Sequence, residues 1–279
     1  MKFTVLGGDL RSVYLAKRLL RDGHEVQCFC LEQEKLPANC HCSTVSEALY
    51  HSQCVILPTP VLKNDVLNAP FGSREITEEE LAEILPRNIP IFGGSVSEAL
   101  RQRCVRRSVY VTDLLSAEAL AVKNAALTAE CALQVILREI PYSLDRQPVL
   151  ILGAGRIGKL LGLRLRALGA AVTVSARREE DKAWCAALGL TPADTADLAP
   201  LLPHCRLLVN TIPAQVLTPM QLSLLPSDAL LFELASKPGG FHQAASARTV
   251  IDCGGLPGKY APQSAADAIA ETIYHCLKR

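Results

Sequence analysis

The sequence predicts an α/β protein with two doubly wound domains of the Rossmann or flavodoxin type, each with a parallel sheet, linked by a long interdomain helix. Three observations support this fold class. Short apolar runs alternate with helical segments, as in parallel sheets covered on both faces. An apolar helical segment at residues 116–139 separates two groups of such runs. The chain has 279 residues, 49% of them apolar, which is enough to bury two cores.

The first domain is expected over residues 1–122, on the substrate side. Its first turn, Gly7-Gly8-Asp9, lacks the spaced glycines of a dinucleotide fingerprint, so no cofactor is assigned to it. The turn is either a plain strand end, with Asp9 near a helix N-terminus, or a substrate loop at the carboxyl edge of the sheet. Thr77 and Glu80 have the spacing of a capping box. The expected strands are residues 2–6, 25–30, 54–57, 89–92 and 108–111, and the expected helices are residues 11–21, 77–85 and 96–105.

The interdomain helix is predicted from apolar residues at helical spacing between residues 116 and 139. Thr128 is predicted to restart this helix as an N-cap, with Glu130 in the new first turn. Glu130 is then either a carboxylate favoured by the helix dipole or an acid of an interdomain cleft.

The second domain, over residues 123–261, contains a glycine-spaced turn between an apolar strand and a helix. Gly153 allows a tight turn, Gly155 lets the backbone approach a pyrophosphate, and Gly158 lets the helix pack closely on the strand. The N–H groups at the helix start then face the phosphates. This context predicts a Rossmann dinucleotide site. The expected cofactor-binding residues are Gly153, Ala154, Gly155, Arg156, Ile157 and Gly158 in the turn, and Thr211, Ile212 and Pro213 at a later strand end.

The other strands of this domain are expected to end in loops that line one crevice. These loops are residues 210–213, 235–240 and 254–258. A C-terminal helix over residues 262–279 is expected to pack back on the first domain, because Ile269, Ile273 and Leu277 recur at intervals of four. The expected strands are residues 148–152, 171–175, 207–210, 229–233 and 249–252.

The end of the second Rossmann strand selects between NAD and NADP, because an acid there binds the ribose 2′-hydroxyl and repels a 2′-phosphate. This chain has Ser175, Arg177 and Arg178 in that region, and no acid. Hydroxyl and guanidinium groups suit a phosphate, so NADP is predicted, with NAD as the alternative. The two arginines are otherwise explained as a solvated helix start.

Composition excludes several classes of protein. A formal net charge of +1 provides no field for nucleic acid or an anionic membrane. No apolar stretch is expected to reach the roughly 20 residues of a membrane span, and the first residues are expected to form a strand and not a signal peptide. A cytosolic protein with its eleven cysteines reduced is expected. Cys28, Cys30, Cys40 and Cys42 cluster around His41 without the C-x-x-C spacing of zinc sites, so no metal is assigned, and zinc stays the alternative.

A set of motifs runs over nearly the whole chain. They are Val5-Leu-Gly-Gly-Asp9 with Arg11, Ile56-Leu-Pro58, Asn124 with Thr128-Ala-Glu130, Gly153-Ala-Gly-Arg-Ile-Gly158, Ala176-Arg177, Asn210-Thr-Ile-Pro213, Leu234-Ala-Ser-Lys-Pro-Gly-Gly240 and Gly255-Leu-Pro-Gly258. Together these motifs resemble the family of the dipicolinate synthase A subunit.

The resemblance implies oxidation of a dihydrodipicolinate-like product of dihydrodipicolinate synthase, with hydride passing to NADP, in the mother-cell cytoplasm during sporulation. It also implies a flavoprotein-like partner, the dipicolinate synthase B subunit, and leaves homo-oligomerisation open. A dicarboxylate needs cations or backbone donors. The expected substrate-binding residues are Gly8, Arg11, Ser95 and Lys237, and the proton acceptor is hypothesised to be Asp9 or Glu130.

Two other functions stay open at this point. D-2-hydroxyacid dehydrogenases share the two-domain layout, but their chemistry needs a histidine positioned by a carboxylate. The six histidines of this chain fall mostly at helix ends and in loops, and His242 alone is near a crevice loop. The other alternative is a nonenzymatic NADP-binding regulatory subunit.

Overall fold

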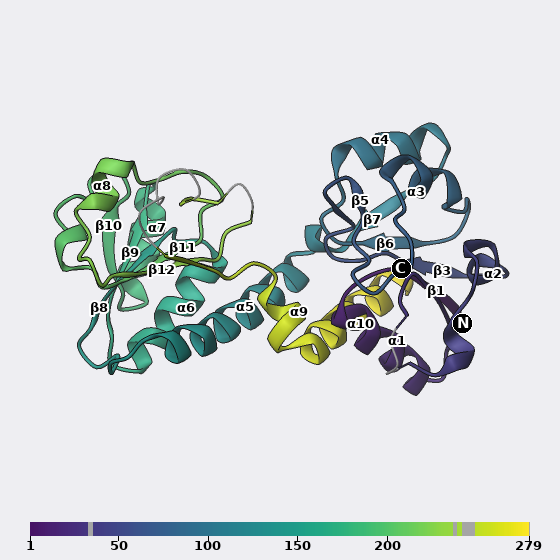
Figure 1. The fold of residues 1–279 in the computed structure, drawn as a ribbon, viewed down its shortest axis with the longest axis horizontal. Helices are drawn as coiled ribbons and strands as arrows, with labels where there is room; N and C mark the ends of the chain where they lie inside the picture. Colours follow the sequence, from purple (N-terminus) through teal and green to yellow (C-terminus); the bar gives the residue numbers. More distant parts are fainter. Residues whose placement is uncertain (33–35, 237–238, 242–248, 279) are drawn as a thin grey trace. The chain divides into compact units, whose positions relative to one another are not determined.

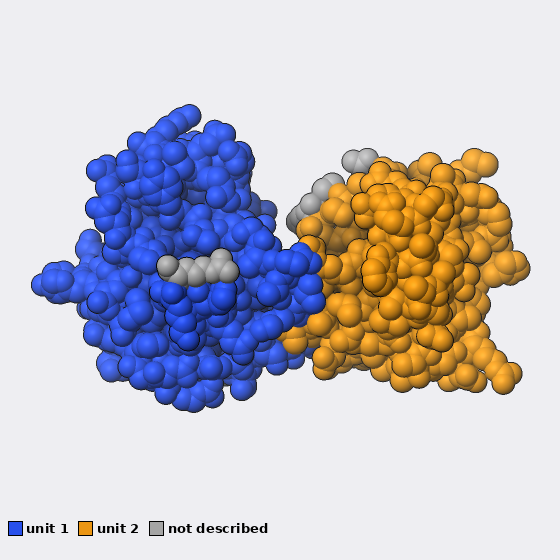
Figure 2. All heavy atoms as spheres, turned by 180° about the vertical axis from the view of Figure 1, so that it is seen from behind, with its two compact units in different colours: residues 1–124, 258–279 blue, residues 125–257 orange. Residues whose placement is uncertain are grey.

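The computed structural model describes residues 1–32, 36–236, 239–241 and 249–278, in two compact units (Figure 2). Unit 1 contains residues 1–124 and 258–279, and unit 2 contains residues 125–257. From the sequence, the divisions between the two units are expected after residues 122 and 261. Residues 258–261 therefore belong to unit 1, which affects the first-unit site described below.

Unit 1 is built on a parallel sheet of five strands in the order β2-β1-β3-β6-β7 (Figure 1). In its register, Phe3 lies beside Val26 on one neighbouring strand and Cys54 on the other. All five strands were predicted, although the last two begin two and three residues later than expected. The strands are β1 (Lys2–Leu6), β2 (Glu25–Phe29), β3 (Cys54–Ile56), β6 (Ile91–Gly93) and β7 (Val111–Asp113).

The segments between these strands contain α-helices, short 3₁₀ helices (η) and one hairpin. Asp9, Thr77 and Ser97 each begin a helix as an N-cap whose side chain accepts a backbone hydrogen bond. A hairpin of two-residue strands, which was not predicted, turns at Asn64 and Asp65, both with positive φ. The elements are α1 (Leu10–Arg21), α2 (Val45–Leu49), α3 (Glu78–Ile84), α4 (Glu98–Arg106), α10 (Pro262–Leu277), η1 (Ala38–Cys40), η2 (Leu114–Ser116), β4 (Leu62–Lys63) and β5 (Val66–Leu67).

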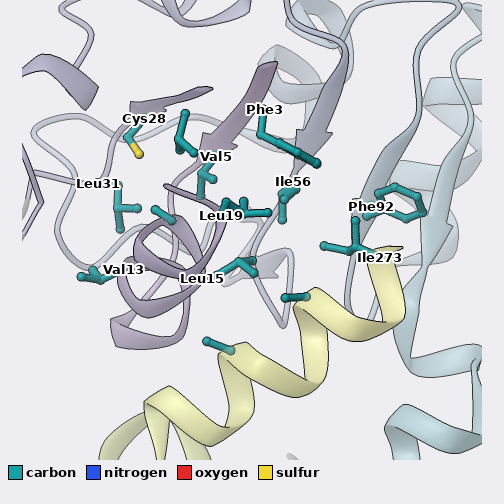
Figure 3. Packing of buried hydrophobic residues seen from close by; sticks show 14 of the residues in the cluster. Phe3, Val5, Val13, Leu15, Leu19, Cys28, Leu31, Ile56, Phe92 and Ile273 are labelled. Atoms are coloured by element: carbon teal, nitrogen blue, oxygen red, sulfur yellow. The ribbon is translucent and has the colours of Figure 1, made fainter. Parts of the chain in front are cut away.

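The side chains of β1 alternate between two cores, as the pleat requires. Phe3 packs in one core with Leu19 of α1 and Ile273 of α10 (Figure 3). Leu6 belongs to the other core, which α3 and α4 cover. The C-terminal helix therefore completes a core whose other members lie between Phe3 and Leu120 in the sequence.

Unit 2 is built on a parallel sheet of six strands in the order β10-β9-β8-β11-β12-β13. Five of these strands were predicted. The sixth, Thr-Pro-Ala-Asp, was missed because it is an edge strand with no apolar run. The strands are β8 (Pro148–Leu152), β9 (Ala171–Ala176), β10 (Thr191–Asp194), β11 (Leu207–Asn210), β12 (Leu230–Glu233) and β13 (Val250–Asp252). The helices are α6 (Arg156–Ala167), α7 (Glu179–Ala187) and α8 (Pro219–Ser223), with the short 3₁₀ helix η3 (Leu202–His204). Helix α9 (Leu256–Tyr260) begins in unit 2 and continues into unit 1 from Gly258.

Helix α5 (Glu118–Glu139) runs without a break from unit 1 into unit 2. The predicted restart at Thr128 is wrong, because Thr128 is buried inside the helix and its alanine-rich neighbours favour helix on both sides. By length and composition alone, α5 could also cross a membrane, contrary to the sequence expectation. However, 44% of its most apolar window is buried inside the protein, as is common in core helices.

Candidate functional site

The turn after β8 places the glycine motif of unit 2 at the carboxyl edge of its sheet. Gly153 has a φ of +102°, in the region that favours glycine. A Cβ on Gly158 would lie 1.9 Å from the carbonyl oxygen of Gly153. Only glycine at position 158 therefore lets α6 begin this close to the strand. These are the structural roles that the spacing predicts.

Gly155 is the N-cap of α6 and leaves the helix start open. A Cβ on Gly155 would meet no atom within 4 Å, and no side chain caps the helix. An uncapped helix start of this kind attracts phosphate through its N–H groups and its dipole. Within the turn, Ala154 is buried, Ile157 is half-buried and Arg156 is exposed. The turn therefore fits the pyrophosphate of a dinucleotide.

The two arginines that follow β9 have different surroundings. Arg178 donates to Asp181 at 2.8 Å and lies 3.3 Å from Glu180. Together with Lys159, Arg178 holds the pKa of Asp181 below its usual value. Arg177 is exposed and, among the residues that the structure describes, has no ion pair. Arg177 alone is therefore available to a phosphate.

Ser175 does not fit the role predicted for it. The strand continues to Ala176, and Ser175 is fully buried within the sheet. A side chain with no exposed surface cannot contact a cofactor, so the prediction of Ser175 as a phosphate ligand is corrected. Ala176 is the residue that ends the strand, where an acid would select NAD.

The carboxyl ends of β8 and β11 border the point where the strand order of unit 2 reverses. Ligands of open α/β sheets bind at such points. Here the hydroxyl of Thr211 donates to the backbone oxygen of Leu152 at 2.8 Å. A Cβ on Gly153 would lie 2.6 Å from that hydroxyl oxygen. The predicted segment of Thr211, Ile212 and Pro213 therefore lies directly beside the glycine turn.

Sequence reasoning missed Glu233, the last residue of β12. Glu233 is 3% exposed and lies beside Asn210 in the strand register. Its carboxylate accepts a hydrogen bond of 2.7 Å from the side-chain nitrogen of Asn210. One pattern in the sequence could have identified this pair, because Asn210 and Glu233 are each the last residue of an apolar strand.

Arg11 lies at the carboxyl edge of the unit 1 sheet, in the first turn of the helix that follows β1. Its backbone N and its Nε donate to Oδ1 of Asp9 at 2.9 and 3.0 Å, and its Nη2 donates to Oδ2 at 2.8 Å. Nη2 also donates to the backbone oxygen of Thr59, which follows β3. Nη1 has no hydrogen-bond partner within the described part of the chain. Asp9 thus orients a buried guanidinium that keeps one nitrogen for an anion.

Arg11 also joins the two loops that border the switch point of unit 1. The chain passes from β1 to β2 on one side and later to β3 on the other. The loops after β1 and β3 therefore lie where a ligand is expected. A Cβ on Gly258 would lie 2.6 Å from Oδ2 of Asp9. Gly258, expected in a crevice loop of the second domain, thus belongs beside Asp9 in unit 1.

Gly8 and Ser95 lie at the same edge of the unit 1 sheet. A Cβ on Gly8 would lie 1.8 Å from the hydroxyl oxygen of Ser12, so the turn requires glycine there. Ser95 follows β6 and is exposed, and its backbone N–H donates to Asp113 at 3.1 Å. Its side chain is therefore accessible to a ligand.

The remaining predicted residues have mixed outcomes. Glu130 is exposed on the part of α5 that belongs to unit 2. Both oxygens of Asp9 accept hydrogen bonds from Arg11, which favours a positioning role over that of a base. Lys237 and His242 lie outside the described residues.

The cysteine cluster of unit 1 packs as part of the core. Cys28, Cys40 and Cys42 are buried, and burial raises the pKa of each thiol, most strongly that of Cys28. The thiol of Cys42 donates to Oε1 of Gln27 at 2.7 Å. Among the described residues, no three His, Cys, Asp or Glu side chains are grouped to hold a metal.

The two halves of the chain match two different protein-family models. Residues 2–115 match the family model of the N-terminal domain of the dipicolinate synthase A subunit. Residues 124–234 match that of the NAD-binding domain of D-isomer-specific 2-hydroxyacid dehydrogenases. The second match contains the glycine turn and the Thr211 segment. Unit 2 is therefore similar to the nicotinamide-cofactor domains of dehydrogenases, which supports a nicotinamide cofactor.

Individual relatives match both halves together. The dipicolinate synthase A subunit of Bacillus subtilis (strain 168) is 25% identical over 99% of this chain and 96% of its own. The crystal structure of the dipicolinate synthase A subunit from Bacillus halodurans, 25% identical, superposes with a TM-score of 0.88 over 100% of this chain and 98% of that chain. A transhydrogenase from Sinorhizobium meliloti, 15% identical, shares the fold alone, with a TM-score of 0.70 over 98% of this chain and 93% of that chain. The predicted fold class, two doubly wound α/β domains with parallel sheets, is confirmed.

Proposed function

We propose that this chain, which is related to the A subunit of dipicolinate synthase along its whole length, oxidises a dihydropyridine dicarboxylate to pyridine-2,6-dicarboxylate with NADP. One observation carries the proposal. A dehydrogenase-type dinucleotide unit is joined to a family-specific unit that holds a buried, oriented Arg11 at its topological switch point.

The proposed reaction removes two hydrogens from the ring. One C–H bond breaks and its electron pair leaves with the hydrogen as hydride, while a second hydrogen leaves as a proton. Bound NADP supplies the hydride acceptor. Because the ring becomes aromatic, the protein has only to hold the dicarboxylate, orient it and receive one proton.

In this proposal Arg11 binds one carboxylate of the substrate. Nη1 is the guanidinium nitrogen that Asp9 and Thr59 leave without a bond, and a charge-assisted bond from it to a carboxylate is strong. The hydroxyl of Ser95, after a neighbouring strand, is a further donor. Lys237 is proposed to bind the second carboxylate, as the family motif around it implies.

The proton acceptor is proposed to be Glu130. Its carboxylate is exposed and the structure describes no hydrogen bond to it, whereas both oxygens of Asp9 are engaged with Arg11. A base must have a free oxygen to receive a proton. If Glu130→Gln retained full turnover, Glu130 would be excluded and solvent would be the acceptor.

The biological setting is proposed from the family alone. It is the mother-cell cytoplasm during sporulation, where the partner is the flavoprotein-like B subunit of dipicolinate synthase. Co-purification of the two proteins from sporulating cells is the expected result, and separate elution of both would oppose it.

The reaction is tested by absorbance at 340 nm. The purified chain, with and without the B subunit, is mixed with NADP and freshly made product of dihydrodipicolinate synthase. We expect NADPH and dipicolinate to form in equal amounts, and Arg11→Met to remove most of the rate at low substrate. Binding of NADP without turnover under either condition would favour the nonenzymatic regulatory subunit. Turnover of a 2-hydroxyacid instead would favour the other alternative enzyme.

A further inference from the structure

Two loops at the carboxyl edge of unit 2 meet at one buried carboxylate. Both oxygens of Glu233 are saturated by N–H donors. Oε1 accepts from the side chain of Asn210 at 2.7 Å and from the backbone of Ala235 at 3.1 Å. Oε2 accepts from the backbones of Gly240 and Phe241 at 2.7 and 3.1 Å. The carboxylate therefore ties together segments that flank the ends of β11 and β12.

Asn210 extends this network into the loop that follows β11. Its side-chain nitrogen also donates to the backbone oxygen of Ile212 at 2.8 Å, and its Oδ1 accepts from the backbone N–H of Ile212 at 3.1 Å. A Cβ on Gly240 would lie 2.5 Å from the same side-chain nitrogen. The position of the Thr211 segment is thus fixed through Asn210 to Glu233.

The strand order locates this network on one half of the cofactor site. A pyrophosphate would bind after β8, and the ribose that carries a 2′-phosphate would then lie at the end of β9, which neighbours β8 on one side. The other half of a dinucleotide must then extend to the opposite side, over β11 and β12. That half carries the nicotinamide. The loops that Glu233 holds are therefore those that would receive the reacting ring.

We propose that Glu233 is a positioning residue, which acts through Asn210 and the Gly240 backbone to hold the loops that bind the nicotinamide half of the cofactor. This inference rests on the proposed cofactor site. Burial of a carboxylate is costly, and a full set of hydrogen-bond donors offsets that cost. One of the four donors comes from Asn210, at the end of β11, and three come from backbone N–H groups after β12. The carboxylate therefore links the ends of the two strands, and its burial is offset only while both segments are in place.

The substitution Glu233→Gln tests this directly. Glutamine keeps the size of the side chain but offers one acceptor oxygen and an NH₂ group that faces two N–H donors. Two hydrogen bonds are lost, whichever way the amide is oriented. We expect the dissociation constant of NADPH to rise at least about tenfold. The constant for adenosine 2′,5′-bisphosphate, which contains only the adenosine half, is expected to stay within about twofold of the unchanged protein. Both constants are measured by titration calorimetry, without turnover.

Two further variants keep the test decisive. Asn210→Ala removes the link to the Thr211 segment. It should also raise the dissociation constant of NADPH and leave that of adenosine 2′,5′-bisphosphate nearly unchanged. This variant therefore still tests the proposal if Glu233→Gln does not fold. Asp228→Asn breaks an exposed ion pair with Arg206, near the amino end of β12, and is expected to change neither constant. An equal rise in both dissociation constants in Glu233→Gln and Asn210→Ala would show a purely structural role and overturn the proposal. Unchanged dissociation constants for both ligands would also overturn it. Failure of the unchanged protein to bind NADPH would instead reject the proposed cofactor.

Discussion

Arg177 and Arg178 are neighbours in the sequence but differ in what surrounds them. The guanidinium of Arg178 is paired with the acidic first turn of α7, through Asp181 and Glu180. Arg177 lies one residue beyond the end of β9, is exposed, and has no ion pair in the described part of the chain. An arginine with free donors at this position suits a 2′-phosphate, whereas a paired arginine is less available for a new anion.

Arg177→Ala is expected to raise the dissociation constant of NADP about 10- to 100-fold and to leave that of NAD nearly unchanged. The reason is the loss of one charge-assisted bond to the 2′-phosphate. Fluorescence or calorimetric titration with both cofactors measures this. Arg178→Ala is the matched control and should affect the two cofactors alike. Equal affinity of the unchanged protein for NAD and NADP would contradict the prediction.

Asp9→Asn is expected to raise the KM for the dicarboxylate about tenfold, with the NADPH dissociation constant unchanged. Asparagine caps a helix as well as aspartate does, so α1 should still begin at the same residue. However, it cannot accept the paired bonds that orient the Arg11 guanidinium. Steady-state kinetics and NADPH titration are compared. An unchanged KM would mean that Arg11 binds no carboxylate of the substrate.

At the scale of elements, polar contacts join helices α1 and α10 of unit 1. Arg18 donates to Asp22 at 2.7 Å and to Asp267 of α10 at 2.9 Å. The hydroxyl of Tyr274 donates to Asp22 at 2.8 Å, and its ring lies against that of His24. Burial and the bond to Asp22 raise the pKa of Tyr274 to about 12. These polar contacts lie beside an apolar contact between the same two helices.

This pKa makes stability depend on pH in the alkaline range. The folded protein keeps the Tyr274 proton above the ordinary tyrosine pKa of about 10, where the unfolded chain loses it. The stabilisation is therefore complete below about pH 10 and is lost as the pH rises towards 12. Tyr274→Phe should be less stable at pH 8 by about 1 kcal/mol and should lose less stability between pH 10 and 12. Urea unfolding at several pH values measures both effects, and parallel pH profiles would contradict the assignment.

At the scale of the whole molecule, the two candidate sites belong to different compact units. The dinucleotide turn lies in unit 2, and the Arg11 site lies in unit 1. Each unit has its own parallel sheet, and unit 1 has buried apolar clusters that draw only on its own residues. Ligands of the two sites should therefore stabilise different parts of the chain.

Calorimetric unfolding is expected to show two transitions. NADPH at 100 times its dissociation constant adds about 2.7 kcal/mol to the unit that binds it, which shifts one transition upward by roughly 10 °C. Dipicolinate should shift the transition of unit 1, which contains Arg11, and should shift that of unit 2 only as far as Lys237 contributes to its binding. Arg177→Ala is the control, in which the NADPH shift becomes smaller at the same concentration. A single transition that both ligands shift together would show that the units unfold as one.

The sequence by itself determined the features that depend on local spacing. These are the alternation of strands and helices, the interdomain helix and the roles of Gly153 and Gly158 in the turn. Each follows from backbone geometry within about ten residues, so a linear pattern is sufficient to predict it. The family motifs added the expectation of Arg11, which lies at the switch point of its sheet.

Only the tertiary structure decided the rest of the site. It separated a free Arg177 from a paired Arg178, buried Ser175, engaged Asp9 with Arg11 and moved Gly258 to unit 1. It also revealed that the buried carboxylate of Glu233 accepts hydrogen bonds from Asn210 and from the backbone of Gly240 at the carboxyl edge of the unit 2 sheet. Each of these facts is set by distances between atoms and by the burial that folding produces. A linear pattern contains neither quantity, and so these assignments required the fold.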